Sequence, residues 1–367
     1  MVNMDVTIRD NNFNIVGIVD DYESIIWTDR YNTPGDFQLY GTLDSTIAEY
    51  CKIGYFVNIP NSDRTMVIET ISAESNPRQS NKITVTGRSV ESILDRRIIW
   101  GTEIFLGENN KVQDAIREII THHVISPAVA QRAIPNFSFI DNSDPALLDM
   151  TFAPIQYDGD NVLEVITNLC QTYNIGFKVI NSGSSFTMSI FNGVNRAADQ
   201  TDYPVITFSE EYDNITESRF DMDKTPYKNV ALVDGDDIPG TDPPVKERVP
   251  AGDEMASGLD RYEMKVEAGI SRNYGDQQEQ QTIPTTKYTQ MIRAKGIEEL
   301  DKLKDIYKLD GKIDTNSLKY GVDYYVGDTM QFVGLFGINT KVRITEFIRC
   351  LDGSGYQEYP SYVIVND

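Results

Sequence analysis

The stretch Lys82-Ile83-Thr84-Val85-Thr86 alternates apolar and polar side chains with a period of two residues. This alternation is typical of a β-strand with one buried face. Residues 1–97 contain further short apolar segments between turns, at 6–8, 15–19, 37–39, 53–59 and 66–71. Because no long helical period interrupts these segments, the sequence predicts that residues 1–97 form a small β-barrel or sandwich.

Residues 98–203 change to a helical pattern. Apolar side chains at 112, 115, 116, 119 and 120 lie on one face of a helix and predict an amphipathic helix. A second helix is predicted from Asn161, with Glu164 three residues later as in a capping box, and it ends before Gly176. Strand patterns on both sides of residues 181–184 then predict a hairpin that packs on this helix. The sequence therefore predicts an α+β unit over residues 98–203.

Strand patterns return from residue 204. The segments 205–208 and 227–233 have strand composition, and residues 261–266 are expected to pair back on 227–233. The acidic, proline-rich stretch 234–257 is expected to be an exposed loop.

A helical period from residue 292 to 307 interrupts this β-rich region. We expect residues 204–272 and 320–367 to form a second β-barrel domain, interrupted by a helical insertion domain at 273–319. The fold class predicted for the whole chain is α+β, mainly β, with two small β-barrel domains, an α+β domain and a helical insertion.

The chain carries 56 acidic and 33 basic side chains, which gives a formal net charge of -23. An acidic surface repels phosphates, so the charge argues against DNA binding. The acidity fits solubility alone, or a negatively charged passage through which DNA slides without sticking. The three cysteines, Cys51, Cys170 and Cys350, are far apart and lack metal-site spacing, so we expect free buried thiols.

The sequence offers few groups for catalysis. Its two histidines, His122 and His123, lie at the end of the first predicted helix. Adjacent side chains on an α-helix diverge by about 100°, so the pair is not expected to share a metal ion or form a relay, and helix capping is the simpler interpretation. The acidic run 234–237 resembles only the start of a calcium loop and is interpreted as solvated charge. Neither GxSxG nor a phosphate-binding glycine motif occurs, so we predict no catalytic, cofactor-binding or metal-binding residue.

Six short runs, at 26–39, 86–97, 227–233, 258–263, 325–328 and 343–346, form an ordered set over nearly the whole chain. Together they resemble the siphovirus tail-hub family of ReqiPepy-type hub-like proteins. The residues of these runs that we expect to serve as scaffold are Trp27, Arg30, Gly35, Phe37, Gly87, Arg96, Arg97, Tyr227, Asn229, Asp260, Arg261, Gly327, Asp328 and Arg343. Glycines at strand ends allow positive φ, and Gly327-Asp328 can make the tight turn that opens a strand.

The resemblance implies a structural baseplate or tail hub protein at the virion tail tip, assembled in the cytoplasm of the host bacterium. It implies a homotrimer in which two β-barrel domains per chain imitate six tube subunits and form the channel for DNA ejection. The implied partners are the distal tail protein or tail-tube ring, the tape-measure protein, and tail fibre or receptor-binding proteins. Phage DNA would pass through without specific binding.

Two other functions remain open from the sequence. One is a tail-associated enzyme that cleaves glycan or peptidoglycan through two carboxylates, although the sequence nominates no such pair. The chain ends soon after the last of the six runs, which argues against an added lytic domain. The other is a receptor-binding adhesin with aromatic sugar sites.

Overall fold

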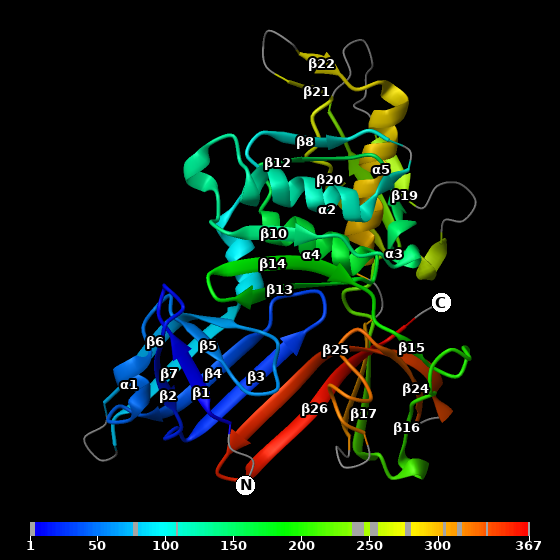
Figure 1. The fold of residues 1–367 in the computed structure, drawn as a ribbon. Coiled ribbons are helices and arrows are strands. Elements are labelled where there is room, and N and C mark those ends of the chain that lie inside the picture. The colour runs from blue at the N-terminus through cyan, green and yellow to red at the C-terminus, as the bar shows by residue number, and fades with distance from the viewer. Residues whose placement is uncertain are drawn as a thin grey trace.

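The computed structural model describes residues 4–75, 80–107, 109–236, 246–249, 256–275, 280–303, 306–313, 318–334 and 337–365. One large β-sheet lies at the bottom of the view in Figure 1, with the short helix α1 beside it, and helices α2 to α5 and the smaller sheets lie above it. The prediction of an α+β chain that is mainly β is confirmed. None of the described helices is long and apolar enough to cross a membrane.

The N-terminal part of the large sheet has the strand order β3-β4-β7-β6-β5-β1-β2. Its elements are β1 (Val6–Arg9), β2 (Ile15–Val19), β3 (Ser24–Arg30), β4 (Asp36–Thr42), the short helix α1 (Thr46–Tyr50), β5 (Phe56–Asn58), β6 (Met66–Glu74) and β7 (Lys82–Ser89). The alternating stretch 82–86 lies in β7, where every second side chain is buried, as the sequence predicts.

The C-terminal part of the same sheet has the order β17-β23-β26-β25, and β24 pairs with β25, β15 and β16. The strands are β15 (Asn195–Arg196), β16 (Thr207–Ser209), β17 (Ile215–Asp223), β23 (Ile306–Ile313), β24 (Thr329–Val333), β25 (Asn339–Asp352) and β26 (Gly355–Ile364). Strand β25 is 14 residues long, so one of its edges accommodates two partners in turn. Its residues 339–343 pair with β24, and its residues 346–351 pair with β3.

The β3–β25 pairing therefore joins the two parts into a single sheet. Among the described strands, the path of paired neighbours runs from β17 at one edge to β2 at the other and does not close into a barrel. The barrel geometry expected from the sequence thus remains a proposal, whereas the strand content of both parts agrees with the prediction.

The α+β unit lies above the sheet in Figure 1. Its elements are a 3₁₀ turn (Val90–Arg96), β8 (Thr102–Phe105), β9 (Asn110–Lys111), α2 (Val112–Ile120), a π-helical turn (Thr121–Ile125), a 3₁₀ turn (Ala130–Arg132), β10 (Phe137–Ile140), α3 (Pro145–Leu148), β11 (Thr151–Phe152), β12 (Ile155–Asp158), α4 (Val162–Thr172), β13 (Gly176–Ser182) and β14 (Ser185–Phe191). The apolar faces of α2 and α4 share one core with β13 and β14. Asn161 caps α4 by accepting hydrogen bonds from the backbone N–H groups of Leu163 and Glu164. Both helices and the hairpin predicted here are confirmed.

A separate small sheet has the order β19-β18-β20 and carries the long helix α5 (Thr285–Asp301). Its strands are β18 (Val230–Asp234), β19 (Lys246–Val249) and β20 (Glu263–Glu267); 3₁₀ turns (Glu210–Tyr212, Gly258–Asp260) and the pair β21 (Asn273–Tyr274) and β22 (Gln281–Thr282) complete the described elements. The expected pairing of 261–266 with 227–233 is confirmed, and it is parallel.

We expected residues 204–272 and 320–367 to share one β domain, but β18 and β20 lie in a different sheet from β24, β25 and β26. Val233 and Val266 pack against Met291 and Ile292, so the apolar stripe of α5 draws β18 and β20 into its own core. Conversely β23, expected within the helical insertion, pairs with β17 and β26 in the large sheet. Residues 246–249 of the expected loop form β19, and residues 237–245 and 250–255 lie outside the described residues. The division of the chain into domains itself stays a prediction.

Candidate functional site

The joint between β3 and β25 contains a buried ion pair. Arg349 Nη1 on β25 lies 2.7 Å from Asp29 Oδ2 on β3, and the two side chains are 4% and 3% exposed. The other oxygen of Asp29 accepts hydrogen bonds from the indole N–H of Trp27 at 2.9 Å and from the hydroxyl of Ser62 at 3.1 Å. Arg349 also donates to the backbone carbonyl of Asn61 at 3.0 Å. The carboxylate thus connects β3, β25 and the loop after β5.

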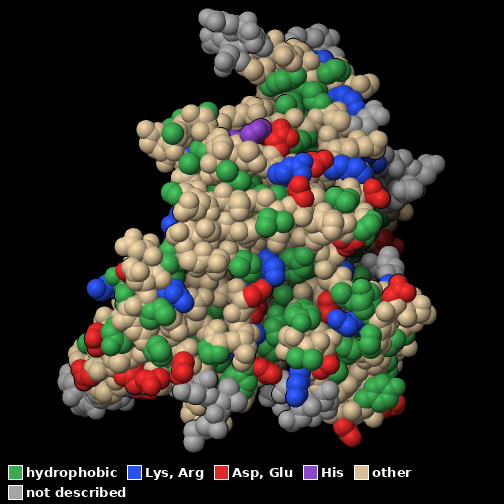
Figure 2. Space-filling model, viewed as in Figure 1, with side chains coloured by type: hydrophobic (Ala, Val, Ile, Leu, Met, Phe, Trp, Pro, Cys, Tyr) green, Lys and Arg blue, Asp and Glu red, His purple; other side chains and the backbone are tan. Residues whose placement is uncertain are grey.

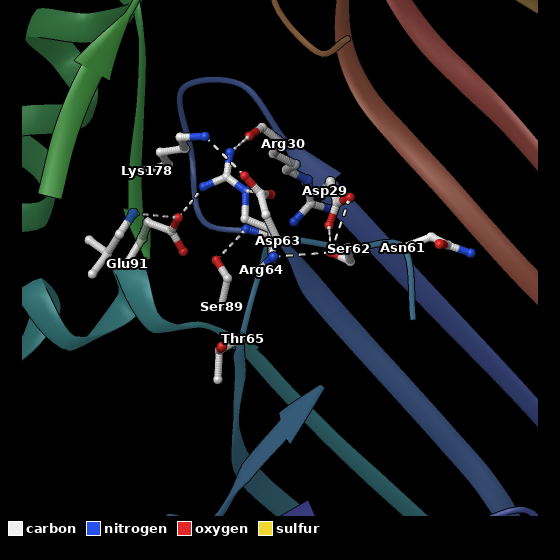
Figure 3. Close-up of polar contacts among 12 residues, drawn as sticks. Asp29, Arg30, Asn61, Ser62, Asp63, Arg64, Thr65, Ser89, Glu91 and Lys178 are labelled. Atoms are coloured by element: carbon white, nitrogen blue, oxygen red, sulfur yellow. Dashed lines mark hydrogen bonds and ion pairs between the residues drawn. The ribbon is translucent and has the colours of Figure 1, made fainter. Parts of the chain in front are cut away.

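A second buried pair connects this joint to the α+β unit. The Arg64 guanidinium contacts the Glu91 carboxylate and also donates to the backbone carbonyl of Arg30 at 3.1 Å (Figure 3). Glu91 lies on the 3₁₀ turn after β7 and accepts the backbone N–H of Val179 on β13 at 2.9 Å. Burial lowers the pKa of Arg64, but the charges of Glu91 and Asp63 outweigh it and raise the pKa above its ordinary value. The Arg64 guanidinium therefore keeps its positive charge.

Arg30 forms the less buried rim of the joint. Its Nε lies 2.6 Å from a Glu346 oxygen on β25, and its Nη2 lies 2.7 Å from Asp36 Oδ2 on β4. It also donates to the carbonyl of Pro34 at 3.0 Å, which holds the turn between β3 and β4. Because each contact uses a different part of the guanidinium, Arg30 connects three strands of the sheet.

The turn that opens β24 is fixed by Gly327 and Asp328. Gly327 has φ +96°, and a Cβ there would lie 2.3 Å from the ring of Tyr31. Asp328 is 2% exposed and accepts the backbone N–H groups of Val194 at 2.8 Å and Tyr325 at 3.1 Å. Its Oδ2 also lies 2.9 Å from Nε of Arg196 on β15. The expected tight turn at 327–328 is present and is tied to the segment that leaves the α+β unit.

Replacing Asp328 by alanine is expected to lower the free energy of unfolding by about 2–4 kcal/mol, because it leaves two backbone N–H groups and the partly buried Arg196 guanidinium without their acceptor. Urea denaturation followed by fluorescence measures the change. The matched control is Asp199→Ala, since Asp199 also contacts a cation, Lys341 at 3.1 Å, but is half-exposed and should be replaceable with little effect. Equal losses for the two variants would contradict the assigned role of Asp328.

A cavity of about 380 Å³ lies beside the joint and is lined in part by Asp29, Asp63, Arg64, Lys178 and Asp328. The charged groups of this lining contact other protein charges. Lys178 lies 2.9 Å from Asp63, and the remaining three take part in the ion pairs described above. The charged side chains of the cavity lining are therefore neutralised by each other and by neighbouring protein groups. Such an arrangement is suited to holding segments of the chain together.

The structure brings one group of the expected scaffold residues together. Trp27 and Phe37 are opposite each other on β3 and β4, and Phe37 is opposite Gly87 on β7. The N–H of Gly35 donates to the hydroxyl of Ser89 at 2.8 Å, and a Cβ on Gly35 would lie 2.2 Å from the carbonyl oxygen of Thr28. These residues surround the joint.

A second group of expected residues surrounds the 327–328 turn. Arg343 donates to the carbonyl of Gly327 at 3.0 Å and lies over the Tyr31 ring at 5.5 Å. Tyr31 in turn donates its hydroxyl hydrogen to the carbonyl of Asn174 at 2.9 Å.

The remaining expected residues lie elsewhere. Asn229 donates to the carbonyl of Asp260 at 2.7 Å and accepts the N–H of Tyr262 at 2.9 Å, which connects β18 to the segment before β20. Tyr227 contacts the ring of Tyr262 edge to face at 5.3 Å. In the same segment, Arg261 donates to the carbonyl of Ala256 at 3.1 Å.

The basic pair after β7 is separate from both groups. Arg96 is exposed, and Arg97 donates to the carbonyl of Arg132 at 2.6 Å. Sequence reasoning did not nominate the four residues of the buried pairs, Asp29, Arg349, Arg64 and Glu91.

The structure gives the two histidines a shared partner that the sequence did not indicate, whereas their helix-capping role stays a prediction. His122 Nδ1 lies 2.8 Å and His123 Nε2 lies 3.0 Å from the same oxygen of Glu103. The adjacent rings share this partner because the chain passes from α2 into a π-helical turn, where α-helical spacing does not apply, and because Glu103 comes from the distant strand β8. Burial would raise the pKa of Glu103, but the hydrogen bonds with His123 and His122 hold it below its ordinary value.

The acidic run at 234–237 also differs from its interpretation as solvated loop charge. Asp234 belongs to β18, has a side chain only 14% exposed and lies 2.9 Å from Lys265 Nζ on β20. Asp236 accepts the backbone N–H of Arg272 at 3.0 Å, and residue 237 lies outside the described residues. Cys51 and Cys170 are free and buried, as expected, and Cys350 is free and half-buried.

Comparisons with known proteins agree with this architecture. A tail protein from Neisseria meningitidis MC58 is 13% identical with a TM-score of 0.56, over 100% of this chain and 97% of that chain. The 43 kDa tail protein of prophage MuSo2 from Shewanella oneidensis is 15% identical with a TM-score of 0.56, over 98% of each chain. A prophage tail protein from Listeria monocytogenes EGD-e is 14% identical with a TM-score of 0.52, over 99% of this chain and 94% of that chain.

The comparison with curated protein sequences gives no match. A family model described as Siphovirus ReqiPepy6 Gp37-like protein matches residues 5–352. The chain therefore belongs to the Siphovirus ReqiPepy6 Gp37-like protein family and has the fold of phage tail proteins.

Proposed function

We propose that the protein is the structural hub of a long-tailed phage, a homotrimer that joins the tail tube to the tail tip and surrounds the channel for DNA ejection. The observation that carries this proposal is the β3–β25 joint. Six residue pairs between these strands hold the N-terminal and C-terminal parts of the chain in one sheet. The buried pairs Asp29–Arg349 and Arg64–Glu91 add side-chain contacts across the same region.

A continuous sheet suits a subunit that must keep two similar halves at a fixed spacing around an axis. In this proposal residues 1–97 and the C-terminal strands each imitate one tube subunit, so three chains present six positions to a six-fold tube. The division into a domain of residues 1–97, an α+β domain of residues 98–203, a second β domain and a projecting helical insertion is part of the same proposal.

The open edges of the large sheet are candidate contacts between copies. Strand β2 is an edge strand, and its Ile15 and Ile18 are 59% and 51% exposed. An edge strand with exposed apolar side chains is a template for pairing with another chain. We assign this edge to the contact between neighbouring subunits of the trimer.

The charge of the chain fits a channel that DNA passes without specific binding. The net charge of -23 repels phosphates, and acidic side chains gather at the lower end of the N-terminal strands in Figure 2. The proposed partners are the distal tail protein or tail-tube ring, the tape-measure protein, and tail fibre or receptor-binding proteins. The proposed place is the virion tail tip, after assembly in the bacterial cytoplasm, and we assign no catalytic step to the chain.

Native mass spectrometry of the purified protein and of isolated tail tips is expected to show three copies, or multiples of three, of this chain. The double variant Ile15→Asp with Ile18→Asp should shift the purified protein to monomers, because it places two charges on the apolar edge. Ile140→Asp is the matched control, since Ile140 is 57% exposed on β10 and outside the proposed contact. A monomer under all conditions, or a ring of six equivalent copies, would contradict the proposal.

A further inference from the structure

The strand β8 meets the end of α2 through a cluster of carboxylates and imidazoles. Glu103 is the residue of β8 that both histidines contact, at 2.8 Å from His122 and 3.0 Å from His123. The ligand-type atoms of Glu103, Glu118 and His122 all lie within 4.8 Å of one another. In Figure 2 the histidine surface lies directly beside acidic side chains.

Two of these residues share one face of α2 and its continuation. Glu118 lies in α2 and His122 in the π-helical turn that continues it, and their ligand-type atoms lie within 4.8 Å of each other. Glu103 approaches from β8, whose backbone pairs with β12 (Ile155–Asp158). Three potential ligands thus converge from two separate elements.

His123 has a different role from His122, because its second nitrogen is occupied. Its Nδ1 accepts the backbone N–H of Trp100 at 3.4 Å, so in the neutral ring the hydrogen is on Nε2 and is donated to Glu103. The His123 side chain is only 5% exposed, whereas His122 is 48% exposed. His123 therefore orients the Glu103 carboxylate from the interior, and His122 closes the cluster towards solvent.

We propose that Glu103, Glu118 and His122 bind a divalent transition-metal ion such as Zn²⁺, with His123 as a positioning residue. One imidazole and two carboxylates are donors that Zn²⁺ accepts, and the two negative charges balance the charge of the ion. Zinc ligands lie about 2.0–2.2 Å from the ion, so the three side chains need only small rotations to enclose it.

Binding replaces the hydrogen between His122 and Glu103 by the ion. Nδ1 of His122 lies 2.8 Å from the Glu103 oxygen, and the ion takes the place of the hydrogen between them. The ring binds the ion through Nδ1 as the neutral tautomer with its hydrogen on Nε2, so a ring that starts as the Nδ1–H tautomer moves its hydrogen and releases no net proton. The hydrogen bond from His123 to Glu103 corresponds to the outer-shell contact that usually supports a ligating carboxylate.

The bound ion would fasten β8 to α2. A ligand that binds the folded chain alone stabilises it in proportion to the logarithm of its concentration, so the melting temperature should rise with added Zn²⁺. This inference is independent of the hub proposal, because it concerns the α+β unit and requires no assembly.

The test uses the full-length chain without a histidine tag, after removal of metal with EDTA. Calorimetric titration with Zn²⁺ and with Co²⁺ is expected to show one ion per chain. The Co²⁺ form should show visible ligand-field bands without a thiolate charge-transfer band, since its ligands are nitrogen and oxygen. Mg²⁺ should not compete, because it favours all-oxygen octahedral sites.

Loss of an outer-shell contact weakens metal binding roughly 10- to 100-fold. Loss of a ligand should cost at least as much, so we expect a decrease of this size or more in each of the variants His122→Ala, Glu103→Gln and Glu118→Gln. His123→Ala should weaken binding less, and His123→Gln, which keeps a donor, should restore it. The exposed Glu49→Gln on α1 is the control and should bind as the native chain does. Circular dichroism shows whether each variant folds. If Glu103→Gln fails to fold, His122→Ala still tests the site, because His122 is exposed and its replacement should not disturb the core.

Unchanged affinity in folded His122→Ala would overturn the proposal. So would an equal loss in Glu49→Gln, a thiolate band in the Co²⁺ spectrum, or the absence of any binding by the native chain.

Discussion

Replacing Asp29 by alanine is expected to lower the free energy of unfolding by about 3–5 kcal/mol, which is a large part of the stability of an ordinary domain. The substitution leaves the Arg349 guanidinium buried at 4% exposure without its countercharge, and it removes the acceptor of the Trp27 indole and the Ser62 hydroxyl. Urea denaturation, followed by tryptophan fluorescence in a Trp100→Phe background so that Trp27 alone gives the signal, measures the change. The β3–β25 joint should open first, because this carboxylate is its central contact.

Two further variants separate burial from charge. Asp141→Ala removes a partner of Arg117 at 2.7 Å whose side chain is 53% exposed, so we expect a loss of no more than about 1 kcal/mol. The double variant Asp29→Asn with Arg349→Gln removes both charges and should be less destabilised than Asp29→Ala, since no unpaired charge stays buried. A loss in Asp29→Ala as small as that in Asp141→Ala would show that the buried pair does not hold the joint.

The local elements of this fold are predictable from sequence because their signals lie within a few residues. The alternation at 82–86 identifies β7, and the apolar spacing at 112–120 identifies α2. Asn161 marks the start of α4 because its side chain can cap the first backbone N–H groups. The two apolar patterns indicate which face of the strand or helix is buried, and burial of that face is sufficient to form the element.

The sequence does not indicate in the same way which elements pack against each other. Asp29 and Arg349 are 320 residues apart, and neither residue alone indicates the other. Period-two alternation places Arg349 on the same face of its strand as Phe347 and so indicates a charge that points inward. The same pattern does not identify Asp29 as the partner of that charge. Similarly, strands β18 and β20 have ordinary strand composition, and only packing against α5 decides that they leave the large sheet.

The histidine cluster shows the same limit. The expectation that His122 and His123 diverge assumed continued α-helix, and the π-helical turn that follows α2 has no signal in the sequence. Glu103 lies 19 residues before His122, on a strand whose position depends on its pairing with β12. A site made of one strand residue and two helix residues is a property of the assembled unit.

Replacing Gly87 by alanine is expected to cost about 3 kcal/mol or more, at the upper end of the usual range for overpacking. Gly87 lies in the middle of β7, opposite Phe37 on β4 and Ile68 on β6. A Cβ there would lie 1.8 Å from the backbone oxygen of Val67 and 2.9 Å from the Phe37 ring. The backbone oxygen cannot move away without disturbing the β6–β7 ladder, so the added methyl group must displace a strand and not merely a side chain.

Gly353→Ala is the matched control for Gly87→Ala. A Cβ at Gly353 meets no atom within 4 Å, and its backbone lies outside the positive-φ region, so this variant should change stability by less than about 0.5 kcal/mol or stabilise slightly. Both variants can be compared by urea denaturation and by the recovery of the assembled oligomer. If Gly87→Ala is as stable as Gly353→Ala, strands β6 and β7 can separate without cost. In that case the close approach of the β6 and β7 backbones would not be the reason for a glycine at position 87.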